Sequence, residues 1–394
     1  MSENTEKKTS KNSNYLSAKE SRRISRENRR ITTAMEKKYQ RKKVPESEYL
    51  TQMRDPKNVV EFDDLHTYFF TDTGTVKAVD GVSFDVPQGV TVGVVGESGC
   101  GKSVTSLSLM QLLQRPQGQI VSGQIRLNLG EDGKAYDVAK MPMYAMEKIR
   151  GNKLSMIFQE PMTSLNPVFR IGAQVDEVIA LHNPTWTKEQ VKKHTISMLE
   201  VVGIANSEGV YKMYPHELSG GMRQRVMISI ALACNPRLII ADEPTTALDV
   251  TIQAQILELI NRLKKERKLS VIFITHDLGV VANMADRIAI MYAGKVVETG
   301  TTAQIFYEHK HPYTEALLRS LPSADAGKRE PLMSIPGTPP DLLCPPKGCG
   351  FAARCRHCMQ ICHEEQPPEF DVGGGHKASC WLLPALARWV SNSE

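Results

Sequence analysis

The chain has 394 residues, of which 41% are hydrophobic and 24% are charged, a composition that is ordinary for a globular protein. This length suggests two or three structural units. No apolar run reaches the roughly 18 residues that a membrane-spanning helix needs, and the polar N-terminus has no signal-peptide core. We therefore expect a cytosolic protein, which a partner could hold at a membrane.

The net charge of +5 is unevenly spread along the chain. Residues 1–50 hold 14 Lys and Arg and 7 Asp and Glu, which is +7, so the remainder carries −2. A nearly neutral main body lacks the overall basic charge of nucleic-acid-binding proteins, and we expect no nucleic-acid partner. Residues 1–55 are predicted to be a basic, disordered extension, or one that becomes helical only on contact. We favour a solvated tail over an arm for anionic lipid or RNA.

Strand-like and helical patterns alternate over residues 56–300 and predict a mainly parallel α/β sheet. Within it, residues 165–232 read as a helical insertion, with Thr187 as a plausible cap of a helix over 187–202. Residues 301–394 are rich in proline and cysteine, which indicates an appended C-terminal region. The expected strands are 59–62, 65–70, 79–86, 90–95, 122–127, 154–159, 238–241 and 271–275, with a helix over 252–263 and a hairpin at 288–292 and 295–298.

The stretch GESGCGKS lies between an apolar strand-like run and an apolar helical segment, the context that the phosphate-loop pattern requires. Its glycines let backbone N–H groups turn toward phosphate oxygens, and the following helix N-terminus adds a positive dipole. Lys102 would bridge the β- and γ-phosphates, and the Ser103 hydroxyl would hold Mg²⁺. The expected nucleotide-binding residues are Gly96, Glu97, Ser98, Gly99, Cys100, Gly101, Lys102 and Ser103.

Asp242 and Glu243 follow a short apolar strand, at the edge of a parallel sheet where ligands bind. Asp242 is placed to organise Mg²⁺ and its waters, and Glu243 can then polarise the attacking water as a general base. A second anion site is expected where Ser219, Gly220 and Gly221 begin an apolar helix. One nucleotide does not need two such sites from one chain, so this second loop is expected to cover the γ-phosphate of ATP bound to another subunit.

Together these motifs resemble those of the nucleotide-binding subunit of ABC transporters. GESGCGKS is similar to Walker A, LSGGMRQR to the signature motif and LIIADEP to Walker B, in the family's order throughout residues 59–300. The resemblance implies an α/β P-loop ABC ATPase with a RecA-like core, an antiparallel β subdomain, a helical insertion subdomain and an appended C-terminal cysteine-rich region. It also implies ATP and Mg²⁺ as cofactors, with two ATP molecules held between two ATPase subunits.

The resemblance also implies roles for residues outside the phosphate loop. Gln159 is similar to the Q-loop glutamine, which would contact Mg²⁺ and relay the state of the site to a membrane partner. Asp249 is similar to the D-loop aspartate, which would contact the opposite subunit. His276 is similar to the switch histidine, which would sense the γ-phosphate and position the water.

Two further assignments from the resemblance concern nucleotide binding alone. Gln224 lies in the signature motif and is expected at the nucleotide. Phe69 would stack on adenine, with its neighbours Tyr68 and Phe70 as alternatives. The expected catalytic set is Lys102, Gln159, Glu243 and His276.

Three stretches narrow the resemblance to the ATPases of oligopeptide and dipeptide importers and their nickel-importing relatives: residues 159–167, 311–318 and 335–340. It then implies an ATPase that drives uptake of di- or oligopeptides from the cytoplasmic face of the cell membrane, as a peripheral subunit. The implied partners are two transmembrane permease subunits, a second ATPase subunit and an extracytoplasmic peptide-binding protein. Import of nickel or another small solute, and a soluble ABC ATPase in translation or DNA repair, are the alternatives.

Six of the eight cysteines fall within residues 344–380. Such a group in a cytosolic protein indicates a metal site before a set of disulfides, and four thiolates suit either zinc or an iron–sulfur cluster. Cys344 and Cys358 are additions to the importer pattern, and Cys358 could form a zinc-like pair with Cys355. Zinc and free thiols are therefore alternatives to the 4Fe–4S cluster that the resemblance implies. The implied cluster ligands are Cys349, Cys355, Cys362 and Cys380.

Overall fold

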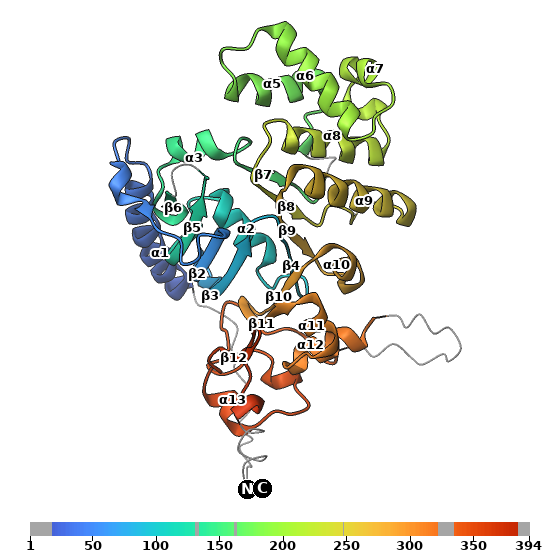
Figure 1. Ribbon diagram of the computed structural model, residues 1–394. Coiled ribbons are helices and arrows are strands. Elements are labelled where there is room, and N and C mark those ends of the chain that lie inside the picture. The colour runs from blue at the N-terminus through green and yellow to red at the C-terminus, as the bar shows by residue number, and fades with distance from the viewer. Residues whose placement is uncertain (1–17, 131–133, 161–163, 247, 322–334, 385–394) are drawn as a thin grey trace, which may run out of the picture.

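The computed structural model describes residues 18–130, 134–160, 164–246, 248–321 and 335–384 (Figure 1). Within these residues, the central sheet has eight strands. Five adjacent ones, from β10 to β7 in the order below, run parallel to one another. The order is β12 (Phe370–Gly373), β13 (His376–Ala378), β11 (Lys295–Thr301), β10 (Arg287–Tyr292), β4 (Thr91–Val95), β9 (Ser270–Thr275), β8 (Leu238–Asp242) and β7 (Leu154–Ile157).

Strands β4, β8 and β9 are buried at every residue. Continuous burial is characteristic of a parallel sheet that is covered on both faces, and it explains why these segments are apolar without alternation. Because the three strands are parallel neighbours, their carboxyl ends lie at one edge of the sheet. That edge positions the candidate site.

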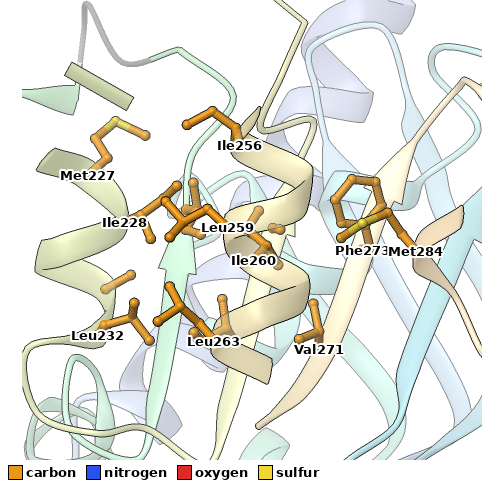
Figure 2. Packing of buried hydrophobic residues seen from close by; sticks show 14 of the residues in the cluster. Met227, Ile228, Leu232, Ile256, Leu259, Ile260, Leu263, Val271, Phe273 and Met284 are labelled. Atoms are coloured by element: carbon orange, nitrogen blue, oxygen red, sulfur yellow. The ribbon is translucent and has the colours of Figure 1, made fainter. Parts of the chain in front are cut away.

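Helices α8 (Gly220–Leu232) and α9 (Val250–Arg267) pack against one face of this sheet, as Figure 2 shows. The buried residues of α9 are Ile256, Leu259, Ile260 and Leu263, a spacing that places them on one face of a helix. They contact the apolar cluster that includes Phe273 of β9. The predicted helix over 252–263 is therefore confirmed and extends further at both ends. Two shorter helices of the core are α2 (Lys102–Met110) and α10 (Leu278–Met284).

Helices also form where the helical insertion was predicted, at the top of Figure 1. Thr187 caps one of them as expected, because its hydroxyl accepts a bond from the Gln190 N–H at 3.3 Å while its own N–H donates to the Gln190 side chain at 2.8 Å. This reciprocal pair is a capping box, which satisfies two donors at a helix start. The helices are α5 (Ile171–His182), α6 (Lys188–Val201) and α7 (Ser207–Lys212).

An antiparallel five-stranded sheet lies at the left of Figure 1. The two strands predicted at 59–62 and 65–70 are one continuous strand, because an irregularity around Asp64, whose φ is +48°, shifts the register without ending the pairing. Helix α3 (Met143–Ile149) follows the sheet. The strand order is β1 (Leu50–Thr51), β6 (Ala135–Asp137), β5 (Gly118–Asn128), β2 (Asn58–Phe70) and β3 (Thr75–Pro87).

Part of the basic extension is folded, which corrects the prediction of disorder over residues 1–55. Residues Ala18–Tyr39 form helix α1, which packs beside β2. The buried Asn28 donates to the Thr71 carbonyl at 2.8 Å, and Arg115 bonds Glu36 at 2.8 Å. Disorder was inferred from composition, which does not report tertiary contacts. In the structure, polar side chains of α1 form hydrogen bonds with residues outside the extension, and these bonds hold the helix in place. Residues 1–17 lie outside the described residues.

The C-terminal region joins the central sheet rather than forming a separate unit. Strand β13 pairs with β11, with Ala378 opposite Glu298, so the hairpin of β12 and β13 extends the sheet by two strands. No helix in the described ranges is long and apolar enough to cross a membrane. The helices in the described part of this region are α11 (Thr302–Tyr307), α12 (Pro312–Arg319), α13 (Gln360–Glu364) and the 3₁₀ turn η4 (Ala352–Arg354).

Candidate active site

The predicted phosphate loop connects the end of β4 to the start of α2. Gly99 and Gly101 have φ values of +79° and +99°, in the left-handed region that favours glycine. A Cβ at Gly96 would lie 2.1 Å from the carbonyl oxygen of Met291, so the close approach to β10 also requires glycine. Lys102 is buried, and its ammonium donates to the Gly96 carbonyl at 2.7 Å and the Glu97 carbonyl at 3.1 Å. The loop therefore curls around its own lysine.

Ser103, in the first turn of α2, meets Asp242, the last residue of β8. The Ser103 hydroxyl donates to Oδ1 of Asp242 at 3.0 Å. Burial raises the pKa of the Asp242 carboxyl, an effect that the bond from Ser103 partly offsets. A hydroxyl and a carboxylate side by side are a donor set that Mg²⁺ accepts, because it prefers oxygen ligands.

Two predicted catalytic residues, Gln159 and His276, converge on the carboxylate of a third, Glu243. Gln159 follows β7 and donates from Nε2 to Oε2 at 3.0 Å, and His276 follows β9 with its Nδ1 3.2 Å from Oε1. The Thr246 hydroxyl, which the sequence analysis did not single out, also donates to Oε2 at 3.0 Å. Glu243 itself has a φ of +45°, uncommon for a residue with a side chain and frequent at functional sites. The parallel strands thus bring side chains from distant parts of the chain together.

The phosphate loop, Gln159, Glu243 and His276 line an open cavity of about 620 Å³, whereas Asp242 does not border it. Residues of the phosphate loop form most of its wall, and Gln159, Glu243 and His276 complete it on one side. Leu317 of α12 also lines it, so the C-terminal region reaches the cavity. Cys100, an expected nucleotide-binding residue, is buried within the loop and does not line this cavity, and burial raises the pKa of its thiol.

The signature residues lie outside the described wall of this cavity. Ser219 caps α8 by accepting a bond from the N–H of Met222 at 3.4 Å, and Gly220 and Gly221 begin that helix. Gln224, also on α8, is buried. Asp249 caps α9 by accepting a bond from Ile252 at 3.0 Å, and a Cβ at Gly221 would meet Ile252 at 2.8 Å. The starts of α8 and α9 are therefore adjacent and separate from the phosphate loop.

The predicted adenine-stacking residue is also outside that wall. Phe69 lies near the end of β2, where it is partly buried and where its ring would be 2.9 Å from a Cβ at Gly118. The Tyr68 hydroxyl donates to Asp80 at 2.6 Å, on another side of the strand. Neither aromatic ring borders the phosphate loop within a single chain.

A second, much smaller cavity gathers four cysteines. All four predicted cluster ligands line it, and all are thiols without disulfides. Burial raises the pKa of Cys349 and of Cys380 to about 11 each. The two additional cysteines do not line it: Cys344 is exposed, and Cys358 Sγ is 3.2 Å from Nε2 of His363. Among the described residues, no group of three or more His, Cys, Asp or Glu side chains stands in an arrangement that could hold a metal ion. The lining residues concerned are Cys349, Cys355, Cys362 and Cys380.

This fold and site define an ATP-binding cassette ATPase. Residues 79–246 match the family model described as ABC transporter, and residues 297–362 match the one described as oligopeptide/dipeptide transporter, C-terminal region. A dimeric structure of a post-hydrolysis state of the ATP-binding cassette MJ0796, bound to ADP and Pi, is similar with a TM-score of 0.54 and 25% identity, over 62% of this chain and 98% of that one.

Relatives at higher identity identify the family more narrowly. The oligopeptide transport ATP-binding protein OppD of Bacillus subtilis is 51% identical over 85% of this chain and 92% of its own length. The dipeptide transport ATP-binding protein DppD of Lactococcus lactis is 48% identical over 85% of this chain and 94% of its own length. The chain belongs to the family of ATP-binding subunits of oligopeptide and dipeptide ABC transporters.

Proposed function

We propose that this ABC ATPase couples ATP hydrolysis to the import of di- or oligopeptides through partner permeases. The observation that carries the proposal is the convergence of Gln159 and His276 on Glu243, beside the phosphate loop. In this arrangement Glu243 takes the proton of the attacking water, as a general base. His276 and Gln159 hold the carboxylate in place from two sides.

The phosphate loop and its neighbours form the proposed ATP and Mg²⁺ site. Lys102 supplies positive charge to the phosphates, and the loop N–H groups donate hydrogen bonds to the phosphate oxygens. Ser103, Asp242 and Gln159 would hold Mg²⁺, which supplies charge neutralisation at the phosphates when bound. The support is the 3.0 Å contact between the Ser103 hydroxyl and Asp242. We propose that Phe69 contacts adenine when a nucleotide draws this strand end toward the loop.

A second ATPase subunit, identical or paralogous, would complete each ATP site. Ser219, Gly220, Gly221, Gln224 and Asp249 are proposed to act on the ATP of that subunit. The start of α8 offers N–H groups that can bind an anion. Because none of these residues lines the described wall of the chain's own cavity, we assign them to the ATP of the other subunit.

The proposed partners are two permeases and an extracytoplasmic peptide-binding protein, with this chain bound peripherally at the cytoplasmic face of the membrane. Exposed apolar side chains within residues 158–169 support a docking surface for a permease: Phe158 is 41% exposed, and Val168 and Phe169 are 71% and 55% exposed. Such side chains are costly to leave in water. The sequences of relatives named for oligopeptides and for dipeptides favour peptides over nickel as cargo.

For the cysteine site we propose an iron–sulfur cluster, with zinc as the alternative. The support is that four thiols line one cavity, while Cys344 and Cys358 do not. Because these thiols do not stand in a ligating arrangement, small shifts of their side chains must accompany binding. Chain purified without oxygen is expected to be brown and to contain iron and acid-labile sulfide. Stoichiometric zinc without iron would identify a zinc site instead.

Glu243→Gln tests the proposed hydrolysis. The amide cannot accept the proton, so turnover is expected to fall about 100-fold or more while ATP binding is retained. Glu258→Gln, an exposed site on α9, is the matched control and should turn over ATP like the wild type. Wild-type turnover by the Glu243→Gln chain would refute the assigned base. Peptide uptake by vesicles that contain the permeases, measured with both variants, then tests the coupling.

A further inference from the structure

The C-terminal region contacts the phosphate loop at Glu97. Arg354, which is 6% exposed, donates from Nη1 to Oε2 of Glu97 at 2.8 Å and from Nη2 to Oε1 at 3.0 Å. The backbone N–H of the same Glu97 donates to the hydroxyl of Tyr313 at 2.9 Å. One residue of the loop is therefore bonded through both its side chain and its backbone, and both partners come from beyond residue 300.

Tyr313 is held in place by its own buried surroundings. It is fully buried, and its ring centroid is 4.5 Å from that of Tyr292 and 5.3 Å from that of Phe351. The Tyr313 N–H donates to Nδ1 of the buried His311 at 3.0 Å, and the His311 N–H donates to Glu298 at 3.0 Å. The stretch 311–318, which the proposed function leaves without a role, thus fixes the tyrosine under the loop.

Arg354 is fixed as firmly. Besides Glu97, its guanidinium donates to the Tyr292 hydroxyl at 3.1 Å and to the Pro336 carbonyl at 2.9 Å. A planar guanidinium that forms two parallel bonds to a carboxylate combines charge with a set direction. Arg354 ends the 3₁₀ turn η4, and Cys355 follows it, so the contact is built on the cysteine-bearing segment.

The charge of Glu97 gives this contact a consequence for nucleotides. Glu97 lines the cavity of the phosphate loop, where an unpaired carboxylate would repel a polyphosphate. The bidentate bond to Arg354 neutralises that carboxylate and holds it toward the C-terminal region. The bond to Tyr313 fixes the peptide that begins the loop.

We propose that Arg354 and Tyr313 are positioning residues of the ATP site, through which the C-terminal region sets the affinity of the phosphate loop for nucleotide. The inference rests on the proposed role of the loop as the phosphate site. Removal of Arg354 leaves the Glu97 carboxylate unpaired next to the phosphates, which weakens binding. Removal of both the Arg354 and the Glu97 charge also removes the repulsion between the carboxylate and the phosphates.

The test is equilibrium titration of the purified full-length chain with MgADP, which is not turned over. Arg354→Ala is expected to raise the dissociation constant about tenfold, in line with the loss of a charge-assisted bond. Adding Glu97→Gln to Arg354→Ala is expected to restore the dissociation constant to within about threefold of the wild-type value. Lys377→Ala removes an exposed ion pair with Glu369 in the same region and is the matched control, with unchanged affinity.

Rescue separates a positioning role from a packing role, since loss of packing around Arg354 would not be repaired by a change at Glu97. Unchanged affinity in Arg354→Ala, or a loss that Glu97→Gln does not repair, would overturn the proposal. If Arg354→Ala fails to fold, Tyr313→Phe replaces it: this variant removes only the hydroxyl, and is expected to raise the ATP KM several-fold at unchanged kcat. An unchanged KM would then overturn the proposal.

Lys102→Ala distinguishes failure of this inference from failure of the proposed site. Loss of MgADP binding in Lys102→Ala with no effect of Arg354→Ala would overturn the inference alone. Wild-type binding in Lys102→Ala would overturn both, because the loop would not be the phosphate site.

Discussion

The core around the phosphate loop and the C-terminal region place their functional groups by different means. In the core, parallel strands β4, β8 and β9 are paired along their length, and each functional side chain follows a strand end. In the C-terminal region, single side chains bond distant backbone groups. The buried Glu298 accepts the N–H groups of Lys310 and His311 as well as Nε2 of His376. Backbone hydrogen bonds between strands form with many sequences, whereas a side chain that accepts several bonds, such as Glu298, cannot be replaced without losing them.

The largest effect is expected from truncation in the core. Leu263→Ala leaves a void between α8, α9 and the sheet (Figure 2) and should lower the free energy of unfolding by about 2–5 kcal/mol. Leu181→Ala, on a side chain that is 70% exposed, is the matched control and should change it by less than about 0.5 kcal/mol. Urea unfolding measures both. Equal losses in the two variants would contradict the assignment of the core.

The second prediction is a loss of folding stability at acidic pH, caused by His311 in the C-terminal region. Burial lowers the pKa of His311 to about 4, so the ring stays neutral in the folded chain while it is protonated below about 6.5 when unfolded. Above pH 6.5 His311 is neutral in both states and does not lower the free energy of unfolding. As the pH falls from 6.5 toward 4, only the unfolded chain takes up the proton, and the free energy of unfolding decreases by about 3 kcal/mol.

Comparison of unfolding at pH 7 and near pH 4.5 tests this effect of His311. His311→Gln keeps an acceptor and does not titrate, so it should flatten the pH dependence, whereas the exposed His216→Gln should not. An identical pH dependence of wild type and His311→Gln would show that this ring is not the titrating group.

A smaller effect is expected where α1 contacts the β subdomain. Asn28→Ala removes the bond to the Thr71 carbonyl and leaves this carbonyl without its side-chain partner, which should cost about 1–2 kcal/mol. Hydrogen exchange of the α1 amides should rise in parallel. Arg26→Ala, on the exposed side of the helix, serves as the control. Fast exchange of α1 already in the wild type would mean that the helix is not docked.

The smallest expected effect is at the cap of α6. Thr187→Ala removes the hydroxyl acceptor of the Gln190 N–H and should reduce stability by about 1 kcal/mol. The exposed Thr185→Ala, two residues earlier, should be neutral. Thermal unfolding of the two variants, measured side by side, decides the point: a shift for Thr185→Ala as large as that for Thr187→Ala would argue against the capping box.

The sequence was sufficient for features that depend on local patterns. The phosphate loop needs glycines at tight turns, the buried strands need unbroken apolar runs, and the helix start at Thr187 needs a capping pair; each requirement is met by neighbours in the chain. Because ligands bind at the carboxyl edge of a parallel sheet, the apolar run before Asp242 and Glu243 placed them at the site, whereas the role of His276 came from the family resemblance.

Only the tertiary structure shows the features that depend on contacts between residues far apart in the chain. Arg354 and Glu97 are 257 positions apart, and no local pattern reports which loop carboxylate a distant arginine will reach. The docking of α1 depends on partners just after β2 and after α2, at Thr71 and Arg115, which composition does not record. Phe69 packs beside Gly118, a contact between β2 and β5 that no local pattern reports. Local conformational preferences are encoded by adjacent residues, whereas these contacts arise from the mutual packing of separate elements.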